Sequence, residues 1–151
     1  MLKLKTGDKA PDFKGKNQDG YDVCLHDYKD KKLVLYFYPK DNTSGCTAEA
    51  CSLRDSYSDF RDRGYEIVGV SPDSEKSHTG FIAKHHLPFT LIADTDKTIA
   101  TAYGVWGEKK MYGRAYMGII RTTFVIDEQG FIGEIIEKVD TKNHAKQIIS
   151  S

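Results

Sequence analysis

The chain has 151 residues, and its 22 basic side chains balance its 22 acidic ones. A neutral protein has no overall field that attracts nucleic acid or an anionic membrane surface, so we expect neither as a partner. With 29% charged and 39% hydrophobic residues, the composition is that of an ordinary globular protein rather than a disordered or fibrous one. No repeat or linker divides the chain, which predicts one domain over residues 1–151.

The sequence contains no obvious targeting segment. Its longest apolar runs, such as residues 33–38, are far shorter than the roughly 20 residues of a membrane span. The first residues run directly into charged side chains and Gly7 without the apolar stretch of a signal peptide. We therefore expect a cytoplasmic protein, in which three cysteines are more often catalytic, metal-binding or inert than bridged.

The first half of the chain alternates strand and helix patterns. Turn residues at 17–20 predict a short N-terminal β-hairpin. Residues 32–38 form an almost unbroken apolar run, typical of a central strand buried on both faces. Apolar side chains then recur at helical spacing, at Cys46, Ala50, Leu53, Tyr57 and Phe60. This spacing predicts one helix that ends at Gly64.

The second half continues the alternation. The predicted elements are a strand at 65–70, a helix from 74 to 86, a short strand at 89–93, a brief helix after 96, a hairpin of 122–126 with 131–137, and a closing helix at 141–149. Residues 104–120 have no clean period, so we expect a loop or an irregular segment there. Together these patterns predict an α/β domain with a mixed sheet flanked by helices.

The most informative stretch is residues 39–51, which follow the buried strand and open the predicted helix. Unpaired backbone N–H groups surround a cysteine in the first turn of a helix, and their partial positive charge favours the reactive thiolate. Cys46 also lies on the apolar face of the helix. We therefore expect a buried thiol near the C-terminal end of the strand, where open α/β sheets place their sites.

Pro39, Thr43 and Cys46 form the pattern Pro-x-x-x-Thr-x-x-Cys, and a later Arg121 precedes Thr-Thr-Phe. This combination resembles the peroxiredoxins, which reduce peroxides with a cysteine thiolate. Glu49 resembles the family glutamate that holds the arginine in place. Cys51 lies five residues after Cys46, as in the subfamily called bacterioferritin comigratory protein or peroxiredoxin Q. The resemblance covers nearly the whole chain and implies a thioredoxin-like fold with an N-terminal β-hairpin extension.

The resemblance also implies an activity and its partners. The expected enzyme is a thiol-dependent peroxidase for hydrogen peroxide and organic hydroperoxides, with no metal or other cofactor. Cys46 would attack the peroxide, and Cys51 would resolve the product as an intramolecular disulfide. Thioredoxin or a similar dithiol protein would return the electrons. A monomer is the expected state, with a weak dimer as the alternative.

Physical chemistry supports the same residues. Attack of a thiolate on an O–O bond releases an alkoxide or hydroxide, so the site must bind one anion and stabilise a second. The donors available for this are the Thr43 hydroxyl, the backbone N–H groups near Gly45 and Cys46, and the Arg121 guanidinium. Pro39 would shape the wall of the pocket and contributes no competing N–H.

The spacing of the two cysteines makes a conformational prediction. Five residues along a helix rise about 7.5 Å and leave the Cα atoms roughly 8 to 9 Å apart, beyond the roughly 7 Å limit for a disulfide. Cys46 and Cys51 can pair only if the helix changes. Our hypothesis is one continuous helix in the reduced protein and local unwinding in the oxidised protein.

Two other functions compete with the peroxidase. A thioredoxin-like disulfide oxidoreductase needs a Cys-x-x-Cys motif, which the chain lacks. A non-enzymatic redox sensor, whose oxidised helix exposes apolar surface to a partner, would use the same residues and stays open. The number of turnovers separates a sensor from an enzyme.

The remaining candidate ligands have simpler interpretations. Cys24 lies in a predicted strand without a motif, and we expect it to be a packing residue. A zinc site made of Cys24, His26, Cys46 and Cys51 would lack a Cys-x-x-Cys knuckle, which argues against zinc. His78, His85, His86 and His144 have polar neighbours, so we expect them at the surface.

Overall fold

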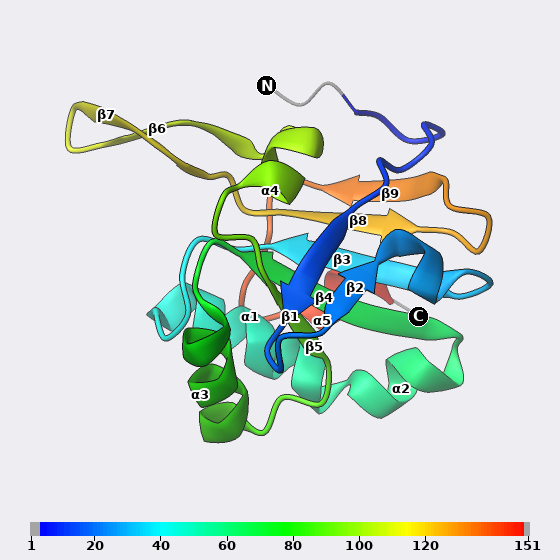
Figure 1. The fold of residues 1–151 in the computed structure, drawn as a ribbon. Helices are drawn as coiled ribbons and strands as arrows, with labels where there is room; N and C mark the ends of the chain where they lie inside the picture. Colours follow the sequence, from blue (N-terminus) through cyan, green and yellow to red (C-terminus); the bar gives the residue numbers. More distant parts are fainter. Residues whose placement is uncertain (1–3, 150–151) are drawn as a thin grey trace.

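The computed structural model describes residues 4–149. Seven strands form one mixed sheet in the order β2-β1-β5-β4-β3-β8-β9 (Figure 1). They are β1 (Lys14–Asn17), β2 (Asp22–Cys24), β3 (Lys32–Phe37), β4 (Tyr65–Ser71), β5 (Thr90–Ala93), β8 (Thr122–Ile126) and β9 (Ile132–Ile136). Strands β3, β4 and β5 are parallel, and the flanking pairs are antiparallel. The sheet confirms the predicted α/β class and the early hairpin.

Two apolar cores lie on the two faces of the sheet. Strand β3 contributes to both, because alternate side chains point to opposite faces. Val34 and Tyr36 pack in the core beneath α1 (Ser44–Asp55), α2 (Tyr57–Asp62), α3 (Glu75–His85) and α5 (His144–Ile148). Leu35 and Phe37 pack in the other core, with α4 (Thr98–Ala102) and the 3-10 turn η1 (Leu25–Tyr28). The prediction of a central strand buried on both faces is confirmed.

The segment at 104–120 is not the loop or irregular segment that the sequence predicted. It forms an antiparallel hairpin of β6 (Trp106–Met111) and β7 (Arg114–Ile119), which projects from the body of the molecule (Figure 1). Tyr112 and Gly113 have φ of 52° and 78° at its turn, as a two-residue hairpin turn requires. Most of its side chains are exposed on both faces. Because neither face is consistently buried, the strands lack the alternation that marks a strand in sequence.

The single helix expected to run from the first turn around Cys46 to Gly64 is also interrupted. Ser56 has φ −107° and ψ 11°, which ends α1 and begins α2. The carbonyl of Ser56 accepts the backbone N–H of Phe60 at 3.0 Å, so the next helix restarts at once. Leu53 and Phe60 still bury their side chains in the same core, and Gly64, with φ 84°, ends the second helix. The apolar spacing therefore predicted correctly which face of this segment is buried. The prediction of one continuous helix was wrong, because the segment forms two helices.

The closing helix α5 covers only five residues, with residues 141–143 in a turn before it. Its buried side chains pack against α1 in the core that holds Cys46. Among residues 4–149, no helix has the length and apolar character needed to span a bilayer.

Candidate active site

Cys46 occupies the first turn of α1, directly beyond the C-terminal end of β3. Thr43 precedes this helix with extended backbone angles, φ −84° and ψ 156°, and is its N-cap residue. The Cys46 side chain is 1% exposed and packs in the core beneath the helix. A buried sulfur among unpaired helix N–H groups is the arrangement that the sequence predicted.

Arg121 joins the thiol to a buried carboxylate. Its Nη2 donates to Cys46 Sγ at 3.3 Å, and its Nη1 donates to Glu49 Oε1 at 2.6 Å. Glu49 lies one turn after Cys46 on α1 and is fully buried. Gly45 leaves room for the guanidinium, because a Cβ there would lie 3.3 Å from Arg121 Nη2. The structure thus brings together residues that the sequence places 75 positions apart.

The charges of this group follow from its burial. Burial raises the pKa of Glu49 to about 7, although the neighbouring Arg121 guanidinium acts in the opposite direction. Burial also disfavours the charged form of Arg121, but the negative charges at Glu49 and Cys46 outweigh it and keep the pKa of Arg121 above its ordinary value. Arg121 is therefore a permanent cation, and Glu49 titrates near neutral pH.

The Thr43 hydroxyl does not act as the donor that the sequence predicted. Its hydroxyl donates to the Lys40 carbonyl oxygen at 3.0 Å, so the Thr43 oxygen faces the site as an acceptor rather than as a donor. Pro39, Thr43, Gly45 and Arg121 together line a pocket of about 530 Å³. The β6–β7 hairpin supplies the outer wall of this pocket, with Trp106, Met111, Tyr116 and Met117. The pocket therefore combines the Arg121 guanidinium and three lysines, Lys40, Lys97 and Lys109, with these apolar side chains.

Cys51 lies two turns after the first residues of α1, on the same helix as Cys46. All three cysteines are free, and Cys51 is half-buried with its Sγ 4.0 Å from His85 Nδ1 on α3. Cys24 ends the edge strand β2 and is also half-buried. Within residues 4–149, no group of three or more His, Cys, Asp or Glu side chains is placed to hold a metal ion.

Comparison with known proteins decides the family. Residues 6–135 match the model of the AhpC/TSA family. The chain is also 46% identical over 150 residues to Peroxiredoxin Bcp of Bacillus subtilis, a match that spans 99% of this chain and 96% of that protein. The chain is a peroxiredoxin of the AhpC/TSA family.

Solved structures agree with this assignment. A cysteine-to-serine mutant of peroxiredoxin Q from Xanthomonas campestris has a TM-score of 0.89 and 34% identity, over 97% of this chain and 96% of that one. The bacterioferritin comigratory protein of the same organism, whose alkyl peroxide reduction was the subject of trapped intermediate and ligand complexes, matches with the same TM-score, identity and coverage. This peroxiredoxin therefore has the thioredoxin-like fold of its family and is a thiol-dependent peroxidase.

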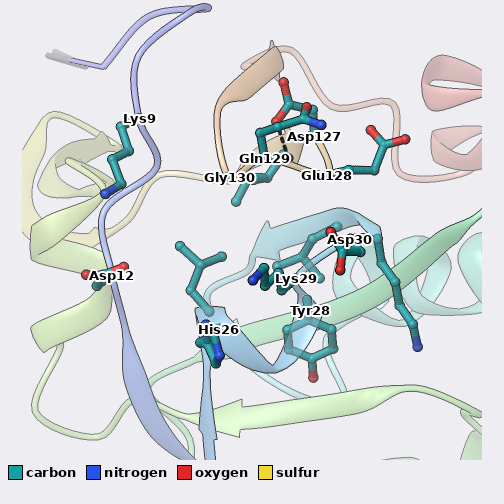
Figure 2. Close-up of a pocket in the computed structure, with 14 residues that line it drawn as sticks. Lys9, Asp12, His26, Tyr28, Lys29, Asp30, Asp127, Glu128, Gln129 and Gly130 are labelled. Carbon is teal, nitrogen blue, oxygen red and sulfur yellow. Dashed lines mark hydrogen bonds between the residues drawn. The ribbon is translucent and has the colours of Figure 1, made fainter.

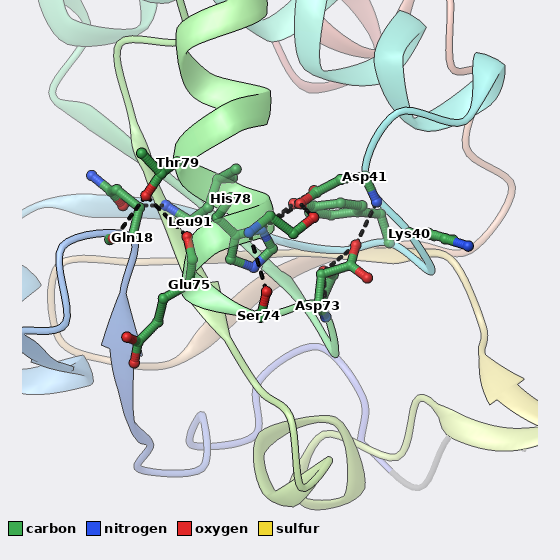
Figure 3. Close-up of polar contacts among 12 residues, drawn as sticks. Gln18, Lys40, Asp41, Asp73, Ser74, Glu75, His78, Thr79 and Leu91 are labelled. Carbon is green, nitrogen blue, oxygen red and sulfur yellow. Dashed lines mark hydrogen bonds and ion pairs between the residues drawn. The ribbon is translucent and has the colours of Figure 1, made fainter.

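A buried polar network anchors the loop that leads into the active site of this peroxiredoxin (Figure 3). The Asp41 carboxylate accepts from the Tyr38 hydroxyl at 2.6 Å and from the Ser77 hydroxyl at 2.8 Å. His78 Nδ1 lies 2.8 Å from the same carboxylate, and His78 Nε2 lies 3.0 Å from the Ile92 carbonyl oxygen. These contacts hold the loop that carries Thr43 against α3.

The network overturns one prediction. The sequence predicts His78 at the surface, but its side chain is fully buried. Both its ring nitrogens have partners from other elements, and the backbone N–H of Asp41 donates to Asp73 at 2.5 Å. Because these partners are distant in sequence, the polar neighbours of His78 along the chain did not reveal its burial.

His144 is a second wrong prediction of the same kind. Its side chain is fully buried, with Nε2 2.7 Å from Thr123 Oγ1 and 3.5 Å from Glu49 Oε2. Packing of α5 on α1 causes this burial, and the Ala145 N–H donates to Ser52 Oγ at 3.1 Å. No local pattern marks His144, because the contact depends on how the last helix docks. His86 is exposed as expected, and His85 is half-buried.

A second pocket, of about 460 Å³, lies at the other end of β3 beside η1 and the β8–β9 turn (Figure 2). Acidic and basic side chains alternate around it, among them Lys9, Asp12, Asp30 and Glu128. None of the site residues predicted from the sequence lines it. Pro39, Thr43, Gly45 and Arg121 instead line the pocket at the C-terminal end of β3.

Proposed function

We propose that Cys46 is the residue that attacks the peroxide in this peroxidase. The observation that carries the proposal is the donation of Arg121 Nη2 to Cys46 Sγ at 3.3 Å. A permanent guanidinium beside the sulfur stabilises the thiolate over the thiol, and the N–H groups of the first helical turn act in the same direction. The sulfur lies between α1 and the start of β8, next to the pocket lined by Pro39, Thr43 and Gly45.

In the first step, Cys46 Sγ attacks the terminal oxygen of the peroxide. An S–O bond forms, the O–O bond breaks, and the leaving alkoxide or hydroxide takes a proton to become alcohol or water. The Thr43 oxygen can accept the O–H of the bound peroxide, since its own hydrogen is held by Lys40. Arg121 stabilises the charge that moves from sulfur to oxygen, and Glu49 holds Arg121 in position.

In the second step, the sulfenic acid of Cys46 reacts with Cys51. The Cys51 sulfur attacks Cys46 Sγ, the disulfide forms, and the sulfenic oxygen leaves as water. Because the two cysteines are five residues apart on continuous helix α1, the first turns of that helix must unwind before the sulfurs can meet. A dithiol protein then reduces the disulfide, and thioredoxin is the donor that we propose.

The pocket supports the proposed substrates. Its apolar wall, with Trp106 and Met117, can contact the hydrocarbon part of an organic hydroperoxide, while Arg121 and Thr43 bind the peroxide group. Hydrogen peroxide has no hydrocarbon part, so it needs only the contacts with Arg121 and Thr43. The alkyl peroxide reduction studied in the Xanthomonas campestris relative supports this choice of substrate class.

The proposal also covers the domain organisation, the oligomeric state and the cellular location of the enzyme. We assign residues 1–151 to a single domain that works as a monomer, since one chain supplies Cys46, Cys51 and Arg121. Three free cysteines suit a reducing compartment, which supports a cytoplasmic location. Analytical ultracentrifugation of the reduced and oxidised protein tests the monomer directly.

The decisive experiment compares cysteine variants. With thioredoxin, thioredoxin reductase and peroxide present in excess, the parent protein should turn over many times. Cys46→Ser should abolish turnover, whereas the matched Cys24→Ser variant should retain it. After one equivalent of peroxide, mass spectrometry should locate the new disulfide between Cys46 and Cys51. Activity that survives Cys46→Ser, or a protein that reacts only once, would refute the proposal.

A further inference from the structure

The second cysteine of the proposed reaction has a histidine beside it. Cys51 Sγ lies 4.0 Å from Nδ1 of His85, the last residue of α3. Both side chains are half-buried, and Cys51 is the one hydrogen-bond partner of the His85 ring among residues 4–149. The steps of the proposed function use Cys51 but leave His85 without a role.

Cys51 lacks the groups that activate Cys46. It follows the first turn of α1, so the backbone N–H groups around it are paired within the helix. The Arg121 guanidinium donates to Cys46 and Glu49 instead. An ordinary thiol is mostly protonated at neutral pH, and only a thiolate attacks another sulfur. A resolving cysteine in this position therefore needs a base that removes its proton.

Arg54 lies one turn after Cys51 on α1, and its donors are already in use. Its Nη1 donates to the His85 carbonyl oxygen at 2.8 Å, while Nε and Nη2 lie 3.0 and 2.9 Å from Asp55 Oδ1. These contacts pair the guanidinium with a carboxylate and join α1 to the last turn of α3. Arg54 thus holds the His85 backbone in place, and the imidazole is the group that contacts the sulfur.

The surroundings of His85 keep its imidazole neutral. Partial burial lowers its pKa below the ordinary 6.5, and the positive charges at Lys84, Arg54 and His86 act in the same direction. Of the described residues, the charged or titratable groups that act on the ring are therefore Cys51 and Arg54 from α1, Lys84 on α3 and His86 beyond its end. A neutral imidazole with its hydrogen on Nε2 presents a lone pair at Nδ1, the atom next to Cys51.

We propose that His85 is the catalytic base of the disulfide-forming step, which takes the proton of Cys51 so that its sulfur attacks as a thiolate. The inference rests on the proposed roles of Cys46 and Cys51. The transfer takes place while α1 is helical, before its first turns unwind and bring Cys46 to Cys51. The 4.0 Å contact belongs to the resting enzyme, in which catalytic hydrogen bonds are commonly longer than in the reacting complex.

The step balances in atoms and electrons. The S–H bond of Cys51 breaks, and its proton moves to His85 Nδ1. The thiolate then attacks Cys46 Sγ, an S–S bond forms, and the S–O bond of the sulfenic acid breaks. The oxygen leaves as hydroxide and becomes water with the proton that His85 returns through solvent. Because the sulfenic sulfur is reduced as Cys51 is oxidised, no further electron donor takes part.

The test follows a single turnover at neutral pH with one equivalent of hydrogen peroxide. Mass spectrometry of quenched samples measures the Cys46 sulfenic acid and the Cys46–Cys51 disulfide over time. His85→Gln cannot take a proton, so disulfide formation should slow by about 10²-fold, the usual contribution of a general base. Sulfenic acid formation should change by no more than about twofold, because His85 does not contact Cys46.

The matched control is His86→Gln, which changes the exposed neighbouring histidine. Both rates of this variant should equal those of the parent. A disulfide rate that His85→Gln leaves unchanged would overturn the proposal, and so would an equal slowing in both variants.

Two further measurements separate a base from a merely structural contact. In the parent, disulfide formation should slow as pH falls through the pKa of His85, below 6.5, because the protonated ring has no lone pair at Nδ1. This measurement needs no variant to fold. In His85→Ala, imidazole added to the buffer should raise the disulfide rate by about tenfold. A flat pH profile in the parent, or no gain from imidazole, would refute the role of His85.

Failure of this proposal is distinguishable from failure of the proposed function. A Cys46–Cys51 disulfide that forms equally fast in the parent and in His85→Gln would reject the base alone. A new bond elsewhere, or peroxidase activity that survives Cys46→Ser, would reject the proposed function itself.

Discussion

Arg121 Nη2 lies 3.3 Å from Cys46 Sγ, and the pairing of two strands puts it there. In the register of β3 and β8, Phe37 is opposite Thr122. Arg121 therefore sits beside the end of β3, at the point where the chain turns toward α1 and Cys46. The antiparallel pairing of these strands is what delivers a permanent cation to the buried thiol.

Replacing Arg121 should have a large effect on catalysis. Arg121→Gln removes the cation and both arms of the fork, so kcat/KM for hydrogen peroxide should fall about 10²- to 10³-fold, as for other donors that stabilise a transition-state anion. Arg121→Lys keeps a charge but cannot contact Cys46 and Glu49 together, so its activity should lie between those of the parent and Arg121→Gln. The matched control is Arg63→Gln, an exposed arginine paired with Asp59. A loss below tenfold for Arg121→Gln would contradict the assigned role.

Glu49 should make stability depend on pH. Its pKa is raised by burial from an ordinary 4.5 to about 7 in the folded protein. Between these values the folded state holds a proton that the unfolded state has lost, so stability should fall as pH rises through this window, by about 3 kcal/mol at most. The Glu49→Gln variant has no titratable carboxyl at this position. Urea unfolding should therefore show this variant gaining stability relative to the parent between pH 5 and pH 8, and a constant difference would disprove the prediction.

Oxidation should release the contacts between α1 and α5. If the first turns of α1 unwind to form the Cys46–Cys51 disulfide, amides across residues 43–54 should exchange with deuterium faster in the oxidised protein. The Ala145 amide should lose protection as well, because it donates to Ser52 within the same segment. Amides of the central strand β3 are the internal control. Equal exchange across 43–54 in both redox states would exclude unwinding.

Asp41 should be important for stability because it anchors the active-site loop. Burial raises its pKa, but hydrogen bonds from His78, Tyr38 and Ser77 outweigh burial and leave the pKa below its ordinary 3.8. Asp41→Asn removes the carboxylate that accepts these buried hydrogen bonds and should cost about 3 kcal/mol at neutral pH. Because the folded pKa is lowered, the difference should shrink as pH falls below about 4, where the parent also loses the charge.

The control for this variant is Asp55→Asn, which affects an exposed carboxylate paired with Arg54. Surface pairs contribute between about 0 and 1 kcal/mol, so its stability should stay close to that of the parent. Guanidinium unfolding measures both variants. Equal small losses for Asp41→Asn and Asp55→Asn would show that the anchor contributes little.

Several features of this protein could be predicted because they depend on neighbours along the chain. The unbroken apolar run of β3 and the turn residues after it placed Cys46 in the first turn of a helix, since strand burial and helix capping follow local periodicity. Pro39, Thr43 and Cys46 then identified the family, and Arg121 with Glu49 completed the candidate site. The α/β class followed from the alternation of strand and helix patterns.

Tertiary structure alone decided the rest. The burial of His78 and His144 depends on partners far away in the chain, such as Asp41 and Thr123, so polar neighbours in sequence pointed to the surface for both. The β6–β7 hairpin has no continuous buried face, and no periodicity could mark it. A local pattern reports which face of a segment is apolar, but only the packing of distant segments determines which polar groups are enclosed and what they touch.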